Sequence, residues 1–341
     1  MENKSKEPDL QRLANKRILI TGASGMIGSC LISLLMDCNR EHHTDIQVVG
    51  VSRKKDLAAS RLGSFMSQEN FIYRSLDINQ PLPELGSFDY ILHGASNTHP
   101  RAYASDPIGT ITANVIGTKQ LLDYAVSHGC QRFVFLSSVE IYGENRGDTE
   151  TFSEEYLGYI DCNTMRAGYP ESKRLGESLC NAYHSAYGLD FVIPRLSRVY
   201  GPGLLDTDTK AVSQFLHKAA AGEDIVLKSK GDQLYSYTYS VDCARAILFL
   251  MLKGEATHAY NVSDDGSVLT LAKLAELLAQ LAGTKVVFEL PDALEQSGYS
   301  KTTKGILSAK KLTEAGFVFH THIREGLEKT LDYLKNRGEY R

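Results

Sequence analysis

The feature that most constrains the fold of this chain is a glycine-rich stretch near the N-terminus, Thr21-Gly-Ala-Ser-Gly-Met-Ile-Gly28. The apolar run 17–21 before it is typical of a short buried strand, and the apolar positions after it recur at helical spacing. In such a strand–turn–helix unit, Gly22 permits a tight turn, Gly25 lets backbone approach a phosphate, and Gly28 lets the helix pack on the strand. The N–H groups of the first helical turn then point to one place, which suits a pyrophosphate.

Strand-like and helix-like segments alternate after this turn. The strand-like segments are 46–51, 71–75, 90–93, 132–137 and 191–196, and the longest helical ones are 113–127 and 168–187. Such alternation predicts an α/β fold with a doubly wound parallel sheet. The rhythm loosens past Gly203, which indicates a smaller α/β lobe that faces the substrate. We expect a frayed N-terminal tail over 1–15, a dinucleotide-binding domain over 16–195, and over 196–341 mainly the substrate-binding lobe, with some elements returning to the first sheet.

Composition narrows the class of protein further. The chain has 341 residues, which exceeds a single compact core, and a net charge of −4, which gives no sign of a nucleic-acid partner. No apolar run is long enough to span a bilayer, and the charged segment 1–12 does not read as a secretory signal. The six cysteines form no CxxC pair. We therefore expect a cytoplasmic protein without a membrane partner and without a metal site.

The end of the second strand bears on the choice of dinucleotide. A carboxylate there favours NAD, because it accepts from the ribose 2′-OH, whereas an arginine suits the 2′-phosphate of NADP. This chain reads Ser52-Arg-Lys54 and has no carboxylate before Asp56. The sequence thus favours NADP over NAD, and a solvated basic turn is the alternative interpretation. Asp77, just past the third strand, is placed to accept a hydrogen bond from an adenine amino group.

One tyrosine–lysine pair has the spacing needed to remove a proton from a substrate hydroxyl during hydride transfer. Tyr169 and Lys173 are four residues apart at the start of a predicted helix, so they share one helix face. A nearby ammonium lowers the pKa of a phenol and lets it accept a proton from a substrate hydroxyl. The serine-containing end of the fifth strand, near Ser138, offers a hydroxyl to the same site. A surface pair on a helix is the alternative for the tyrosine and lysine alone.

With these pieces in place, nearly the whole chain resembles the extended short-chain dehydrogenase/reductase family, whose members modify nucleotide sugars on a Rossmann fold. The matching motifs are 21–28, Ser137-Ser-Val-Glu-Ile-Tyr-Gly143, Tyr169-x-x-x-Lys173, Arg195-Leu-Ser-Arg-Val-Tyr-Gly-Pro202 and Asn114-Val-Ile-Gly-Thr118. The resemblance implies Ser138, Tyr169 and Lys173 as catalytic residues. It also implies a tightly bound cofactor and a homodimer through a four-helix bundle, formed by helices that begin near Ala113 and Gly168.

Within that family, details look most like the branch of UDP-glucuronate decarboxylases and dTDP-glucose 4,6-dehydratases. Glu140 matches the glutamate two residues after the catalytic serine or threonine, and the run 155–166 looks like the decarboxylase loop before the tyrosine. Three positions depart from the pattern. Val139 replaces the dehydratase acid, Arg198 replaces an asparagine, and Tyr235 stands where an arginine meets the nucleotide diphosphate. We hypothesise that Arg198 supplies the cation that Tyr235 lacks, or alternatively that it pairs with a nearby carboxylate.

The sequence therefore predicts an NAD(P)-dependent nucleotide-sugar enzyme that works through a 4-keto intermediate, as an epimerase or decarboxylase. Val139 disfavours a full 4,6-dehydratase. The alternatives are an NADPH-dependent reductase of a sugar or sugar nucleotide and a non-catalytic NADP-binding regulator. The predicted catalytic residues are Ser138, Tyr169, Lys173 and Glu140. The predicted cofactor-binding residues are Gly22, Ser24, Gly25, Met26, Ile27, Gly28, Ser52, Arg53, Asp77, Ile78, Ala95, Ser96, Tyr169 and Lys173. The predicted substrate-binding residues are Arg198, Tyr235, Asn97 and Arg166.

Overall fold

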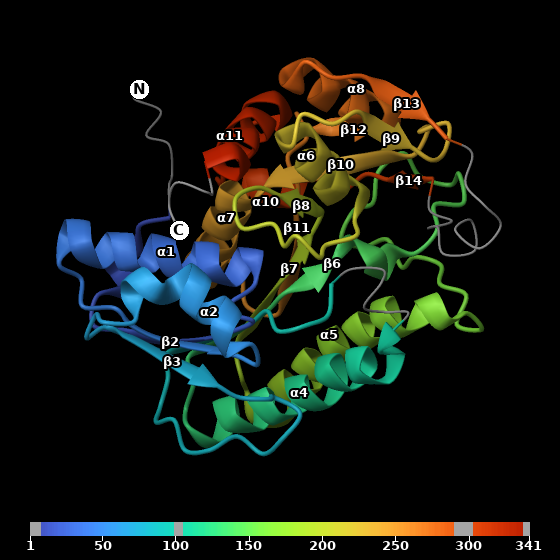
Figure 1. Cartoon of the computed structure of the whole chain (residues 1–341). Coiled ribbons are helices and arrows are strands. Elements are labelled where there is room, and N and C mark those ends of the chain that lie inside the picture. The colour runs from blue at the N-terminus through green and yellow to red at the C-terminus, as the bar shows by residue number, and fades with distance from the viewer. Residues whose placement is uncertain (1–7, 99–104, 290–302, 337–341) are drawn as a thin grey trace, which may run out of the picture.

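The structure, a computed structural model, describes residues 8–98, 105–289 and 303–336, and it consists of a large α/β lobe and a smaller lobe beside it (Figure 1). The main sheet is parallel throughout and has the order β11-β7-β5-β4-β1-β2-β3, with β6 paired to β7. Its strands are β1 (Arg17–Thr21), β2 (Gln47–Ser52), β3 (Phe71–Ser75), β4 (Tyr90–His93), β5 (Arg132–Phe135), β6 (Ser137–Ser138), β7 (Phe191–Leu196) and β11 (His258–Val262). The strand order reverses between β1 and β4, which confirms the predicted doubly wound fold.

Helices cover both faces of this sheet because its strands are apolar on both faces. Ile18 and Ile20 of β1 share one buried cluster with residues of α1 and α7, whereas Leu19 between them belongs to a cluster with α4 and α5. The two helix pairs lie on opposite sides of the sheet in Figure 1. The helices of this lobe are α1 (Met26–His42), α2 (Lys55–Leu62), α4 (Pro107–Ser127), α5 (Gly168–Tyr187), α7 (Ser240–Lys253) and α10 (Lys310–Glu314).

The smaller lobe has its own core, in which Tyr235, Tyr237 and Tyr239 are all buried. Its helices pack around a short mixed sheet of order β12-β10-β14, to which β8 adds, and a two-stranded sheet of β13 and β9. The strands are β8 (Arg198–Tyr200), β9 (Ile225–Leu227), β10 (Leu234–Tyr239), β12 (Val268–Thr270), β13 (Val286–Phe288) and β14 (Lys304–Gly305). The helices are α6 (Ala211–Ala220), α8 (Leu271–Ala282) and α11 (Ile323–Asn336). The chain crosses between the lobes more than once. After the first elements of the smaller lobe, α7 packs on the main sheet and β11 joins it beside β7.

Three expectations differ from the structure. Helix α4 begins at Pro107 instead of residue 113, because the side chain of Asp106 accepts a hydrogen bond from the N–H of Gly109 and caps an earlier turn. The expected frayed tail over 1–15 is too long: Leu10–Leu13 forms a 3-10 helix and Leu13 is fully buried, while residues 1–7 lie outside the described part. The single strand expected over 132–137 is divided into β5 and β6, and short 3-10 helices follow at Val139–Tyr142 and Met165–Ala167.

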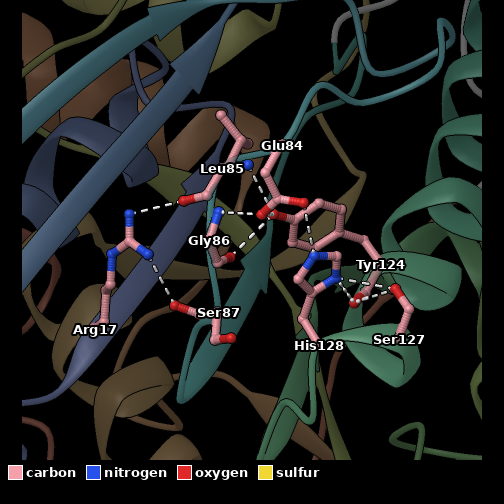
Figure 2. A network of polar contacts seen from close by, with 8 residues as sticks. All are labelled: Arg17, Glu84, Leu85, Gly86, Ser87, Tyr124, Ser127 and His128. Carbon is pink, nitrogen blue, oxygen red and sulfur yellow. Dashed lines mark hydrogen bonds and ion pairs between the residues drawn. The ribbon is translucent and has the colours of Figure 1, made fainter.

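A polar network fixes α4 at the end of the sheet opposite to the carboxyl ends of its strands (Figure 2). The Tyr124 hydroxyl accepts from the N–H of Leu85 at 2.9 Å, and the Tyr124 ring stacks on His128 with centroids 3.9 Å apart. His128 Nε2 lies 3.2 Å from a Glu84 carboxylate oxygen, and Arg17 of β1 donates to the carbonyl of Leu85. The C-terminal turn of α4 is thereby held against the loop that leads into β4, so the helix cannot slide along the sheet.

Candidate active site

A cleft opens at the carboxyl ends of the parallel strands, between the two lobes. All but one of the site residues expected from the sequence line it, and the exception is Tyr235. The glycine-rich turn between β1 and α1 forms one wall, the ends of β2, β4 and β6 and the start of α5 form the floor, and residues after β8 close the far side. The cleft therefore combines segments from residue 21 to residue 210 of the chain.

The turn between β1 and α1 has the geometry of a phosphate site. Gly22 has φ +75°, and a Cβ there would lie 2.7 Å from the carbonyl of Gly94. A Cβ on Gly28 would lie 2.3 Å from the carbonyl oxygen of Gly22. Gly25 is the N-cap of α1, and no described side chain caps it. The first turn of α1 thus faces the cleft with its backbone, and the residues of this turn fit a dinucleotide pyrophosphate.

At the other end of the predicted cofactor site, Ser52, Arg53, Asp77 and Ile78 all line the cleft. The guanidinium of Arg53 lies 3.4 Å from the side-chain oxygen of Asn97, which brings the ends of β2 and β4 together. Ala95 and Ser96 line the cleft beside them.

Tyr169, Lys173 and Ser138 all line the cleft. Lys173 is 3% exposed, donates to the carbonyl of Leu136 at 2.8 Å and lies over the ring of Phe135 at 4.7 Å. Burial lowers the pKa of Lys173 to about 7, and the negative charge of Glu177 opposes this only in part. Glu177 is itself paired with Arg195 through two hydrogen bonds. Lys173 therefore loses its proton more readily than an exposed lysine, and it lies one helical turn from Tyr169 on α5.

Glu140 lies between two arginines that also line the cleft. Arg166 is 3.3 Å from one of its carboxylate oxygens and Arg198 is 3.9 Å from the other. The Arg198 guanidinium also lies 3.7 Å from the ring centroid of Tyr235, which is a cation–π contact. The carboxylate alternative for Arg198 is therefore realised in this structure, with Glu140 as the partner. Tyr235 does not line the cleft itself; it lines a small adjoining cavity and contacts Arg198, which lines both.

Comparison with known proteins shows which family the chain resembles. Residues 18–263 match the model of the NAD dependent epimerase/dehydratase family. The UDP-glucuronic acid decarboxylase 6 of Arabidopsis thaliana is 31% identical over 283 residues, which cover 82% of this chain and 79% of that protein. The UDP-glucuronic acid decarboxylase 1 of Xenopus tropicalis is 30% identical over 327 residues, which cover 95% of this chain and 73% of that protein.

This chain belongs to the NAD dependent epimerase/dehydratase family. The resemblance drawn from the sequence motifs is confirmed, and the chain is an enzyme of this family, which sets aside the non-catalytic regulator. Solved structures share its fold. A UDP-glucose 4-epimerase of Thermotoga maritima superposes with a TM-score of 0.80 at 23% identity, over 95% of this chain and all of that one. A dTDP-glucose 4,6-dehydratase of Streptomyces venezuelae with NAD bound superposes with a TM-score of 0.81 at 24% identity. The match covers 95% of this chain and 98% of that one.

The structure of this family member also shows cleft residues that motif reasoning missed. Asp208 and Lys210 line the cleft, and the Lys210 ammonium lies 3.2 Å from the Asp208 carboxylate. Asp208 and Lys210 lie in the loop before α6, where the sequence has no motif and no regular periodicity to reveal them. Across the described residues, no group of three histidine, cysteine or acidic side chains is arranged to hold a metal ion, and no helix there is long and apolar enough to cross a bilayer.

Proposed function

We propose that this enzyme acts on a nucleotide sugar through a 4-keto intermediate, as an epimerase or a decarboxylase. The observation that supports the proposal is that Ser138, Tyr169 and the buried Lys173 line the same cleft as the glycine-rich turn. The names of relatives at 30–31% identity, UDP-glucuronic acid decarboxylases, support a nucleotide sugar as the substrate class.

Each residue then has a defined task. Tyr169 removes the proton from the sugar hydroxyl at C4, and Lys173 favours the phenolate that does so. Ser138 hydrogen-bonds to the oxygen that becomes the carbonyl. The dinucleotide, when bound by the turn of β1 and α1 and by the ends of β2 and β4, supplies a hydride acceptor that can return the hydride. Glu140, held by two arginines, is the residue next to the sugar available for a second step.

Val139 argues against a full 4,6-dehydratase. Loss of water from the sugar needs a proton donor beside the base, and the position expected for that acid carries an apolar side chain. Epimerisation at C4 needs no such donor. Decarboxylation needs none for a leaving hydroxyl, although the enolate left when carbon dioxide departs must take up a proton at C5. The decisive test is incubation with UDP-, dTDP-, CDP- and GDP-sugars, followed by mass analysis of the products. We expect either an unchanged mass with a changed sugar or loss of carbon dioxide; loss of water would contradict the proposal.

We further propose that the enzyme prefers NADP to NAD. Ser52 and Arg53 line the cleft at the end of β2, whereas Asp56, the first carboxylate after this strand, lies within α2. An arginine at this position binds a 2′-phosphate in a bidentate manner. We expect a lower Kd for NADP than for NAD and loss of the difference in Arg53→Ala; tighter NAD binding by the wild type would contradict the preference. Net consumption of NADPH with a sugar substrate would favour the reductase alternative instead.

Arg198 is proposed to bind the anionic diphosphate of the substrate. Because the ring of Tyr235 supports its guanidinium from one side, Arg198 presents its charge to the cleft. We expect Arg198→Ala to raise KM by roughly tenfold to a hundredfold, since a charge-assisted hydrogen bond is lost. The measurement is steady-state kinetics, with Arg324→Ala on the exposed face of α11 as the control. An unchanged KM would leave Arg198 only as a partner of Glu140.

A homodimer through α4 and α5 is also part of the proposal. These helices pack on each other and expose apolar side chains on their outer surface, among them Ile111, Ile116 and Leu175 at 40–46% exposure. A second copy of the same helix pair would cover them as a four-helix bundle. We expect sedimentation to show a dimer that Ile116→Lys with Leu175→Lys converts to a monomer, whereas Val318→Lys on another exposed site does not. A monomeric wild type would refute this interface.

A further inference from the structure

A continuous chain of buried hydrogen bonds runs from the glycine-rich strand to the proposed catalytic tyrosine. It begins where β1 and β4 end side by side, with Thr21 opposite His93 in the parallel register. Every side chain that carries it is at least nine-tenths buried. The side chains are Thr21 of β1, His93 of β4, Thr118 and Asn114 of α4, and Ser172 of α5, and the chain ends at the carbonyl of Tyr169.

The partners of Thr118 decide which nitrogen of His93 carries the proton. The Thr118 hydroxyl donates its one hydrogen to the carbonyl of Asn114, at 2.5 Å. It therefore accepts the bond from His93 Nε2, at 3.0 Å, and Nε2 must bear a hydrogen. A neutral imidazole then has an acceptor at Nδ1, which receives the Thr21 hydroxyl at 2.8 Å. Thr21 in turn accepts from the N–H of Ala95, at 3.2 Å.

The surroundings of His93 keep the imidazole neutral. Its ring is fully buried between Phe133 and Phe135, with centroids at 6.3 and 5.7 Å. Burial and the nearby charge of Lys173 both hold the pKa of His93 well below its usual value. The ring nitrogens thus have fixed and different roles. Nδ1 accepts from Thr21 on β1, and Nε2 donates to Thr118 on α4.

We propose that His93 is a positioning residue, which ties the ends of β1 and β4 to α4 and, through Asn114 and Ser172, sets where the Tyr169 peptide lies relative to the cofactor turn. Asn114 Nδ2 donates to the Ser172 hydroxyl at 2.9 Å, and that hydroxyl donates to the Tyr169 carbonyl at 2.8 Å. His93 itself does not line the cleft among the described residues, so it acts only through these neighbours. This role rests on the proposed function of Tyr169.

Thr118 offers a matched pair of variants for the test. Thr118→Val keeps the shape of the side chain but removes the hydroxyl that His93 needs, whereas Thr118→Ser keeps the hydroxyl and loses only a methyl group. We expect Thr118→Val to lower kcat by roughly 10- to 100-fold, since small misplacement of a reacting group is costly, and to leave KM within about twofold. Thr118→Ser should retain most of the wild-type kcat. Equal kcat values for the two variants would refute the positioning role.

A second measurement does not depend on activity. In ¹⁵N-histidine NMR of the full chain, we expect His93 to carry its proton on Nε2 and not to titrate from about pH 5.5 to about pH 8, around the ordinary histidine pKa. The signal is assigned with His93→Gln or, should that variant not fold, by its movement in the two Thr118 variants. A proton on Nδ1, or titration in this range, would overturn the proposal. An active Tyr169→Phe enzyme would refute the function of Tyr169 while leaving this NMR result to stand on its own.

Discussion

Replacing Tyr169 by phenylalanine should lower kcat by roughly 10²- to 10⁴-fold, the range that a positioned acid–base group contributes. The phenol lies in the cleft that the glycine-rich turn borders, and the helix that carries it also carries the buried Lys173. Phenylalanine preserves the ring and its packing, so the Kd for the dinucleotide should stay within about twofold. The measurements are single-turnover kinetics on the substrate identified by the sugar panel and equilibrium binding of the dinucleotide.

The control for this variant is Tyr187→Phe, which removes the hydroxyl of a tyrosine exposed at the far end of the same helix. It should leave kcat unchanged. If Tyr169→Phe retained wild-type turnover, proton removal would have to come from another group and the proposed mechanism would be wrong. If both kcat and cofactor binding were lost, Tyr169 would instead be needed for the shape of the cleft.

Lys173→Met should make the protein inactive and more stable at the same time. Its ammonium is buried, and burial lowers its pKa to about 7 from the ordinary 10.5. Each pKa unit corresponds to about 1.4 kcal/mol of unfavourable burial of the charge. Methionine removes that cost but leaves the Leu136 carbonyl without its donor, so we expect a net gain of roughly 2–3 kcal/mol in unfolding free energy near pH 6. We expect kcat to fall by roughly 100-fold or more.

The pH dependence gives this prediction a sign that can be checked. Between the folded pKa of about 7 and the unfolded value of 10.5, the unfolded chain binds more protons at this lysine than the folded one. The lysine's contribution to unfolding free energy therefore rises with pH across this interval. The advantage of Lys173→Met should be largest at and below about pH 7 and shrink towards about pH 10. Urea unfolding without cofactor at several pH values measures it, with Lys329→Met on exposed α11 as the control. A Lys173→Met protein that is less stable near pH 6 would contradict the argument.

The features that could be predicted from the sequence are those whose geometry is local. The turn is set locally by the positive φ of Gly22 and by the close approach of Gly28 to the Gly22 carbonyl, and the spacing of Tyr169 and Lys173 follows from one helix. The parallel sheet followed from alternating apolar segments. The first residue of α4 could not be predicted in this way, because it depends on a single cap at Asp106.

The arrangement around Glu140 could not be predicted, because it depends on tertiary contacts. Arg166 comes from the turn before α5, Arg198 from β8 and Tyr235 from β10, and only the pairing of β8 with β10 puts the last two in contact. The sequence predicted all three as substrate-binding residues but could not show that a carboxylate lies between the arginines. The buried hydrogen bonds of His93 were missed for the same reason, since a lone histidine at a strand end has no motif.

The return of the chain to the main lobe at α7 and β11 limits where this protein can be truncated and when it can fold during synthesis. A polypeptide that stopped at residue 195 would contain every strand up to β7, yet it would present β7 as an open edge and leave uncovered the apolar stripe of α1 on which α7 packs. Such a fragment is a candidate for aggregation and not for independent folding. During synthesis, too, the main sheet cannot be completed until residues 240–262 have left the ribosome. The two halves of the chain are therefore expected to fold together.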